Sequence, residues 1–141
     1  MRILITEDDF ISRHLLCHLL ASWGTCDQAA NGAEAVEAFS RALDEKRPYD
    51  VVLLDIMMPV MDGQAALTEI RRLEESRNIW GLAAVKVIMT TALDDRKTVL
   101  TAFRHQCELF LVKPIDEKIL YQQMRGLGFT PTPAMDKPVV A

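Results

Sequence analysis

The chain has 141 residues, half of them hydrophobic, and a formal net charge of −4. This length suits one ordinary domain with its own core and leaves no room for a second folded domain. The sequence pI of about 5.3 argues against direct binding of nucleic acid or anionic lipid, because both need a basic surface.

Cysteine usage and the N-terminus indicate the compartment. The 3 cysteines are widely spaced and without a CxxC pair, and the opening stretch MRILITEDD turns acidic before a signal-peptide core could form. The sequence contains no apolar run that approaches the length needed to span a bilayer. We therefore expect a cytoplasmic protein that does not insert into membranes.

Hydrophobic periodicity predicts β-strands that alternate with helices along the whole chain. The strands are expected at residues 2–6, 25–30, 51–55, 84–91 and 108–112. The helices are expected at residues 10–23, 32–43, 64–75, 94–106 and 116–125. The final stretch FTPTPAMDKPVVA is rich in proline and too poor in apolar residues to form a core. We therefore assign residues 1–128 to one folded domain and residues 129–141 to a disordered, proline-rich tail.

Local signals support the boundaries of these elements. Gly24 follows the last apolar residue of the first helix, as is typical of a helix end. Asn31 with Glu34 forms a capping pair for the second helix, and Asp62 begins a turn before the third. The run VVLLD at 51–55 is apolar up to its final acid, which predicts a strand buried on both faces.

The alternation of strands and helices predicts an α/β fold, a doubly wound parallel sheet with helices on both faces. In such folds ligands bind beyond the carboxyl ends of the strands, near the point where the strand order reverses. This rule selects residues at the ends of the predicted strands, namely Glu7, Asp8, Asp55, Thr90, Thr91 and Lys113.

These residue types together suggest phosphate chemistry. Three carboxylates at one sheet edge repel each other unless a cation lies between them. Magnesium fits best, since it takes oxygen ligands, needs few protein carboxylates and typically bridges to a phosphate. The lysine could supply charge to phosphate oxygens, and a threonine hydroxyl a hydrogen bond. Asp55, at the end of the most buried strand, is the best placed nucleophile, and its attack on phosphorus would give an acyl phosphate.

Four motifs in register, ILITEDD, LLDIMMPVMDG, VIMTTA and FLVKP, resemble the receiver domain of bacterial two-component response regulators, in particular single-domain receivers of the chemotaxis type. The resemblance covers roughly nine tenths of the chain and implies a flavodoxin-like fold with a five-stranded parallel sheet and five helices. It implies that Asp55 is the phosphorylated residue and that Asp9 only starts the first helix. The implied Mg²⁺ ligands are Glu7, Asp8, Asp55 and the backbone carbonyl of Met57.

The resemblance also assigns roles at the ends of the last two strands. Thr91 matches the switch hydroxyl and Lys113 the phosphate-binding lysine, and with Asp55 they form the implied catalytic set. The Lys113–Pro114 peptide bond is expected to be cis. Phe110 belongs to the switch as well. It stands where the family often has a tyrosine, so a rotating ring is retained but its hydroxyl contact is lost.

Two apolar positions are expected to set the lifetime of the phosphorylated state. By resemblance, the residues two after the phosphoacceptor and two after the switch threonine flank the path of the attacking water. Here they are Met57 and Leu93. Neither side chain can accept a hydrogen bond to position or activate water, which predicts slow dephosphorylation. The alternative is that both side chains point into packing.

The resemblance implies a signalling receiver rather than a turnover enzyme, with self-catalysed phosphotransfer and autodephosphorylation as its chemistry. The implied partners are a sensor histidine kinase or a histidine phosphotransfer protein, and a downstream protein that reads the face formed by the fourth helix, fifth strand and fifth helix. Three alternatives stay open: an intermediate of a phosphorelay, a receiver fragment of a larger regulator, and a Mg²⁺-dependent phosphohydrolase. The last is disfavoured, because Met57 stands where such enzymes carry a second acid.

Overall fold

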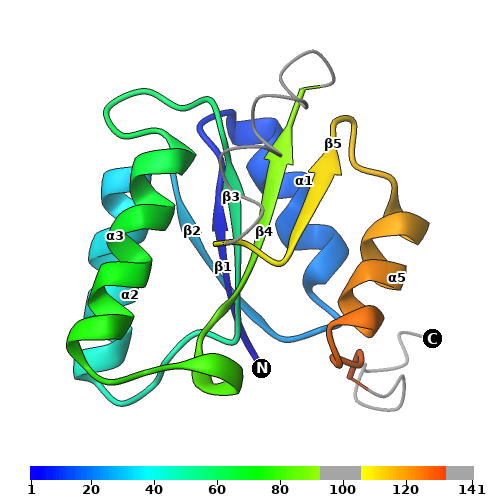
Figure 1. Cartoon of the computed structure of the whole chain (residues 1–141). Helices are drawn as coiled ribbons and strands as arrows, with labels where there is room; N and C mark the ends of the chain where they lie inside the picture. The colour runs from blue at the N-terminus through cyan, green and yellow to red at the C-terminus, as the bar shows by residue number, and fades with distance from the viewer. Residues whose placement is uncertain (93–105, 133–141) are drawn as a thin grey trace.

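The computed structural model describes residues 1–92 and 106–132, and the element labels follow Figure 1. The strands are β1 (Arg2–Thr6), β2 (Thr25–Ala29), β3 (Val51–Asp55), β4 (Lys86–Thr91) and β5 (Leu109–Val112). The helices in the described ranges are α1 (Phe10–Leu20), α2 (Gly32–Asp44), α3 (Gly63–Ser76), the 3₁₀ helix η1 (Gly81–Ala83) and α5 (Glu117–Gly126). Every predicted strand is therefore confirmed, whereas the helix predicted at 94–106 lies outside the described residues.

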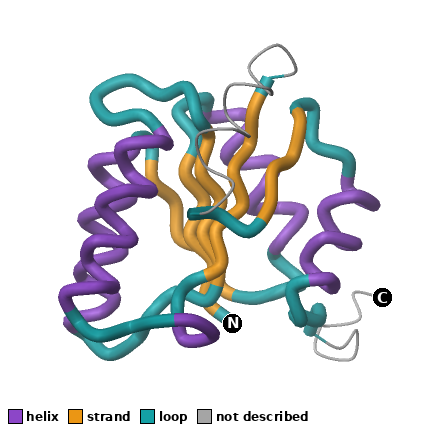
Figure 2. Tube along the Cα trace, viewed as in Figure 1, coloured by secondary structure: helices purple, strands orange, loops and turns teal. Residues whose placement is uncertain are grey.

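The strands form one five-stranded parallel sheet in the order β2-β1-β3-β4-β5. Helices α2 and α3 cover one face of the sheet, and α1 and α5 cover the other (Figures 1 and 2). The predicted fold class, a doubly wound parallel α/β sheet of the flavodoxin-like type, is confirmed. The strand order reverses between β1 and β3, so the carboxyl ends of these two strands lie side by side where such folds bind ligands.

The sheet separates two hydrophobic cores. Successive residues of a strand point to opposite faces, so Leu4 packs with α2 and α3, whereas Ile3 packs with α1 and α5. Strand β3 is buried along its whole length, as its sequence predicts. A parallel strand covered on both faces needs apolar side chains on both. An acid at its end, Asp55, therefore requires a partner of its own.

Side-chain caps fix the start of each described α-helix. The caps are Asp9, Asn31, Asp62 and Asp116, which accept hydrogen bonds from the backbone N–H groups of Ser12, Glu34, Ala65 and Ile119. The role predicted for Asp9, the start of the first helix, is therefore confirmed. The Glu34 carboxylate in turn accepts from the Ala30 N–H at 2.9 Å.

Helix α1 ends at Leu20, three residues before the predicted end at Trp23. The chain turns over residues 21–24 and buries Trp23, whose backbone N–H donates to the Leu20 carbonyl at 2.9 Å. A Cβ at Gly24 would approach the Met1 carbonyl oxygen to 2.2 Å. Glycine is therefore required at this position, because any side chain would collide with the residue that precedes β1.

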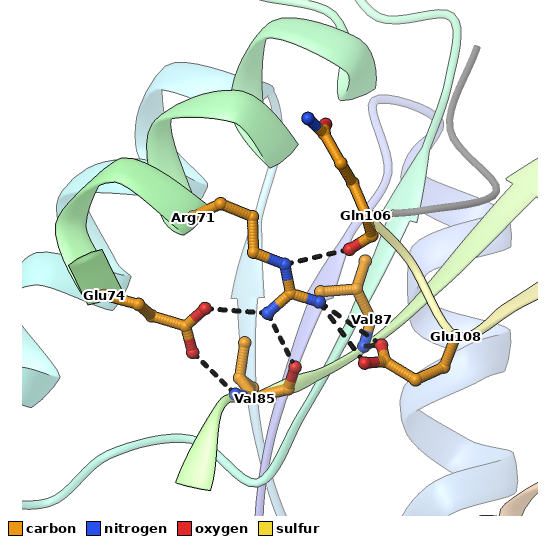
Figure 3. Close-up of polar contacts among 6 residues, drawn as sticks. All are labelled: Arg71, Glu74, Val85, Val87, Gln106 and Glu108. Carbon is orange, nitrogen blue, oxygen red and sulfur yellow. Dashed lines mark hydrogen bonds and ion pairs between the residues drawn. The ribbon is translucent and has the colours of Figure 1, made fainter. Parts of the chain in front are cut away.

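Three charged residues form a cluster at the amino ends of β4 and β5, and we call Arg71, Glu74 and Glu108 the amino-end cluster (Figure 3). Arg71 reaches from α3 and donates to Glu74 at 2.7 Å, to the Val85 carbonyl at 2.9 Å and to the Gln106 carbonyl at 2.8 Å. Its Nη2 lies 3.3 Å from Glu108 Oε2. The cluster thus connects α3 to the segments where β4 and β5 begin.

The chain after α5 begins with two further contacts. Phe129 packs against the core between α1 and α5, and its N–H donates to the Met124 carbonyl at 3.1 Å. The Thr132 N–H donates to the Ser22 carbonyl at 2.6 Å. Residues 133–141 lie outside the described residues, so the domain boundary at 128 and the disorder of the tail stay predictions.

Within 1–92 and 106–132, no helix combines the length and the apolar character that crossing a membrane requires.

Candidate functional site

The acids predicted from the sequence converge at the reversal point of the sheet. Glu7 and Asp8 directly follow β1, and Asp55 is the last residue of the adjacent strand β3. One carboxylate oxygen of each lies within 4.8 Å of the other two. Glu7 and Asp55 are buried, while Asp8 is exposed. The cluster therefore extends from the interior of the protein to solvent.

A lysine completes this group, and we call Glu7, Asp8, Asp55 and Lys113 the acidic site. Lys113 directly follows β5, and its Nζ donates to Glu7 Oε2 at 2.9 Å and lies 3.0 Å from Asp55 Oδ2. Its backbone N–H donates to the Thr91 carbonyl at 2.8 Å. The Lys113–Pro114 peptide bond is cis, as predicted. The ammonium group thus lies between two of the three acids.

Burial and close neighbours shift the pKa values of Glu7 and Lys113. Desolvation by burial is the largest cause of the pKa shift of Glu7. The hydrogen bond from Lys113 opposes it and the Asp55 charge adds to it, so the pKa rises from 4.5 to about 6. Desolvation lowers the pKa of Lys113, but its hydrogen bonds to Glu7 and Asp55 outweigh that effect and hold the pKa above its ordinary value. Lys113 is therefore a cation at neutral pH.

The donor set fits a hard divalent cation. One ammonium group compensates only part of the charge of three acids, and carboxylates this close repel each other. Mg²⁺ takes oxygen ligands, uses few protein carboxylates and keeps several waters. Because Asp8 is exposed, the acidic site is open on the side where water or phosphate oxygens would complete the coordination.

The residues predicted to switch lie on β4 and β5. Thr91 is buried at the end of β4, and its Oγ1 donates to the Ala92 carbonyl at 3.0 Å. Thr90 pairs with Asp55 in the sheet, and its hydroxyl lies 3.5 Å from a β3 carbonyl oxygen. Phe110 is half-buried against the core that α2 and α3 cover. Thr91, at the last position of the strand, is therefore the hydroxyl better placed to change partner.

The loop between β3 and α3 carries Met57, whose side chain is 66% exposed. This exposure argues against the alternative that Met57 only packs. The loop itself is held closely. A Cβ at Gly63 would approach the Asp55 carbonyl oxygen to 2.3 Å, and the Gly32 N–H donates to the Met61 carbonyl at 2.9 Å. Leu93, the second residue predicted to tune dephosphorylation, lies outside the described residues.

Arg13 of α1 contacts the backbone of the acidic site at Glu7, and the sequence analysis did not identify it. Its Nη1 donates to the Glu7 carbonyl at 2.8 Å, and its Nε donates to Gln28 Oε1 at 3.0 Å. The sequence does contain a signal, namely the spacing of Arg13 four residues after the Asp9 cap. Long side chains of a helix point back toward its N-terminus, and here that end adjoins the carboxyl end of β1.

Comparison with known proteins identifies the same kind of domain. Residues 3–125 match the response regulator receiver domain family. The chain is 35% identical over 115 residues to the chemotaxis protein CheY of Bacillus subtilis, and the match covers 80% of this chain and 85% of that protein.

Two solved structures are similar in both fold and sequence. The receiver domain of the sensor histidine kinase PA1611 from Pseudomonas aeruginosa has a magnesium ion coordinated in its active-site cleft. It aligns with a TM-score of 0.71 and 30% identity over 90% of this chain and 97% of that chain. A co-crystal structure of the Saccharomyces cerevisiae histidine phosphotransfer protein Ypd1 with the receiver domain of Ssk1 aligns with a TM-score of 0.72 and 26% identity, over 91% and 88% of the two chains. With the site described above, these matches show that the chain belongs to the response regulator receiver domain family and is a signalling receiver.

Proposed function

We propose that Asp55 accepts a phosphoryl group from a phosphohistidine of a partner protein and that the transfer requires Mg²⁺. The observation that carries this proposal is the acidic site itself, with three carboxylate oxygens within 4.8 Å of each other and the Lys113 ammonium between two of the acids. Such a site presents a nucleophilic carboxylate beside fixed charge that can stabilise phosphoryl oxygens.

The ligands proposed for Mg²⁺ are Glu7, Asp8, Asp55 and the backbone carbonyl of Met57. When bound, the ion neutralises the carboxylates and attracts the phosphoryl oxygens to the site. The magnesium ion in the active-site cleft of the PA1611 receiver domain supports this choice of metal.

In the proposed transfer, Asp55 attacks the phosphorus in line with its bond to the histidine nitrogen. An oxygen–phosphorus bond forms as the phosphorus–nitrogen bond breaks, and the nitrogen keeps the bonding electrons. Lys113 moves its hydrogen bonds from the acids to a phosphoryl oxygen, where a charge-assisted contact is strong. The Thr91 hydroxyl, which bonds the adjacent Ala92 carbonyl, changes partner to the phosphoryl group.

We propose that the Thr91 movement transmits the signal. It frees space beside β4 that Phe110 can enter, and this reshapes the face formed by β5, α5 and the helix predicted at 94–106. The described part of that face holds a groove of about 220 Å³ with Phe110, Ile115 and Ile119 in its wall. A downstream protein that binds the two shapes with different affinity reads the change, and a difference of about 1–3 kcal/mol suffices.

The proposed phosphoryl donor is a sensor histidine kinase or a histidine phosphotransfer protein. Helix α1 leaves large apolar side chains in solvent: Phe10, Ile11 and Leu15. A cavity of about 350 Å³ beside Leu15 also has Glu7 and Lys113 in its wall. An exposed apolar surface that borders Glu7 and Lys113 of the acidic site suits a protein donor. The structure of Ypd1 with the Ssk1 receiver domain supports the same class of partner.

The chemistry of the chain is self-catalysed phosphotransfer and autodephosphorylation, without turnover of a separate substrate. We propose the same chemistry whether the chain is a single-domain receiver or part of a larger regulator.

A cytoplasmic location fits the three cysteines, which are free, because disulfides are rare in reducing compartments.

Labelling with acetyl phosphate tests the phosphoacceptor. We expect intact-mass spectrometry to show one added phosphoryl group on the wild type with Mg²⁺ and none with EDTA. The Asp55→Asn variant should stay unlabelled, while Asp9→Asn should label normally, because asparagine also caps helices well. Stoichiometric phosphorylation of Asp55→Asn would refute the assignment.

A second test separates donor docking from chemistry. Ile11, with 74% of its surface exposed, is replaced by serine. We expect Ile11→Ser to slow phosphotransfer from a cognate histidine kinase and to leave labelling by acetyl phosphate unchanged. Leu82→Ser is the matched control, since Leu82 is 95% exposed but lies in η1, away from the acidic site. Equal kinase rates for all three proteins would remove α1 from the proposed docking surface.

A further inference from the structure

Arg13 connects the end of β1, the end of β2 and the start of α1. Its Nη1 donates to the Glu7 carbonyl oxygen at 2.8 Å, and its Nε donates to Gln28 Oε1 at 3.0 Å. The guanidinium carbon also lies 5.5 Å from the centre of the Phe10 ring. These contacts from separate elements give the half-buried side chain a defined position.

The carbonyl that Arg13 contacts belongs to the peptide between Glu7 and Asp8. Because a peptide group is planar, fixing its oxygen fixes the direction in which Asp8 leaves β1. The Glu7 N–H is held by the Ala29 carbonyl at 3.1 Å, and Asp9 is held as the cap of α1. Asp8 is therefore exposed, yet it lies between two anchored residues.

We propose that Arg13 is a positioning residue that raises the affinity of the acidic site for Mg²⁺ by orienting the Glu7–Asp8 peptide. The inference rests on the proposed metal site. Groups that orient metal ligands typically change metal affinity by about 10–100-fold when they are removed. Arg13 fits this role, because its donor reaches the backbone of the ligand segment and leaves the carboxylates free.

Charge alone predicts the opposite effect. A guanidinium cation close to a metal site repels a second cation, so its removal should tighten Mg²⁺ binding. Orientation of the ligand segment works in the other direction, and its removal should weaken binding. The sign of the change in Mg²⁺ affinity therefore separates the two roles.

The experiment is a titration of the full chain with Mg²⁺ alone in a calorimeter. We expect Arg13→Gln, which removes the charge and shortens the side chain, to weaken Mg²⁺ binding about tenfold or more. Arg13→Lys keeps the charge but cannot make both contacts, and it should weaken binding as well. The control is Arg41→Gln, which removes the same charge from an exposed ion pair on α2 and should leave the affinity within about twofold.

A second variant tests the hydrogen bond between Arg13 and Gln28 of β2. Gln28→Ala keeps Arg13 and its charge but removes one of its partners, and it should weaken Mg²⁺ binding by a smaller factor. In the Arg13→Gln background the same substitution should have no further effect, because contacts within one network are not additive. Melting in EDTA is recorded for every variant, since a purely structural role would lower the melting temperature without changing the affinity.

Unchanged or tighter Mg²⁺ binding by Arg13→Gln overturns the inference. If Arg13→Gln does not fold, the exposed Gln28→Ala variant decides, and an unchanged affinity there overturns it. If instead the proposed function is wrong, the wild-type chain itself binds no Mg²⁺, so the two failures can be told apart.

Discussion

Each end of the parallel sheet holds a cation between carboxylates, but the two ends differ in how fully the protein provides hydrogen-bond partners for these carboxylates. In the amino-end cluster, each guanidinium nitrogen of Arg71 has an acceptor (Figure 3). Both carboxylates there also accept backbone N–H groups, Glu74 from Val85 at 2.6 Å and Glu108 from Val87 at 2.5 Å. The carboxylates of this end therefore find their hydrogen-bond donors within the protein itself.

The acidic site at the other end is left with excess charge. Three carboxylates face one ammonium group, two of them are buried, and the pKa of Glu7 is raised to about 6. The comparison teaches that a buried ion pair does not by itself mark a functional site. What distinguishes the acidic site is like charge that the protein leaves uncompensated and open to solvent, which is a requirement for binding a cationic ligand.

The largest effect is expected from breaking the amino-end cluster. Arg71→Met leaves the buried Glu74 carboxylate without its cation, and loss of one partner of a buried pair costs about 3–5 kcal/mol of unfolding free energy. Urea denaturation measures the loss. Arg72→Met is the control, because Arg72 pairs with Glu69 on the exposed surface and should cost less than about 1 kcal/mol. Equal losses for the two variants would contradict the structural role of the cluster.

The acidic site should respond to a similar change in a way that Mg²⁺ can reverse. In EDTA, Lys113→Met leaves Glu7 and Asp55 to repel each other, and we expect a loss of about 2 kcal/mol, smaller than for Arg71 because Lys113 is partly exposed. Saturating Mg²⁺ should restore most of that stability, since a ligand that binds only the folded state stabilises it. Arg71→Met should gain no more from Mg²⁺ than the wild type does. The opposite pattern would show that the two ends are not distinct in function.

The fold and the grouping of the acidic site were predictable because their signals are local. Apolar runs and caps define the strands and helices, and parallel strands bring their carboxyl ends to one edge. Glu7, Asp55 and Lys113 could therefore be grouped, because each stands at the end of a predicted strand. The departure at the end of α1 involves a contact between positions far apart in sequence, the close approach of Gly24 to Met1.

Contacts made by long side chains were not predictable. Arg71 reaches Glu108 across 37 positions of sequence, and Arg13 reaches Gln28 across 15. Periodicity gives the face on which such residues lie but not their partners. For the same reason α1 shows an apolar pattern from Phe10 onward, yet its first apolar residues are exposed, because periodicity does not reveal whether another element covers them.

The pH dependence of stability tests the charge balance of the acidic site through Glu7. Its pKa is raised from 4.5 to about 6 in the folded state, so between these values the folded state binds more protons than the unfolded state. Stability in EDTA should therefore fall as pH rises through this window, by about 2 kcal/mol in all. Glu7→Gln should flatten that part of the curve. A variant curve parallel to that of the wild type would mean that Glu7 is not the titrating group.

The smallest effect concerns a side chain at the rim of the acidic site. Met57 is exposed and cannot position water by hydrogen bonding, so Met57→Asn should shorten the lifetime of phosphorylated protein, by up to about tenfold, or 1.4 kcal/mol in the barrier. Decay after removal of acetyl phosphate, at saturating Mg²⁺, measures it. Val60→Asn is the matched control, because Val60 lies in the same loop, is 85% exposed and has a φ of 69° that asparagine tolerates. Leu93→Glu extends the test to the second predicted position. If Met57→Asn, Leu93→Glu and their double variant all decay like the wild type, neither side chain controls the attacking water.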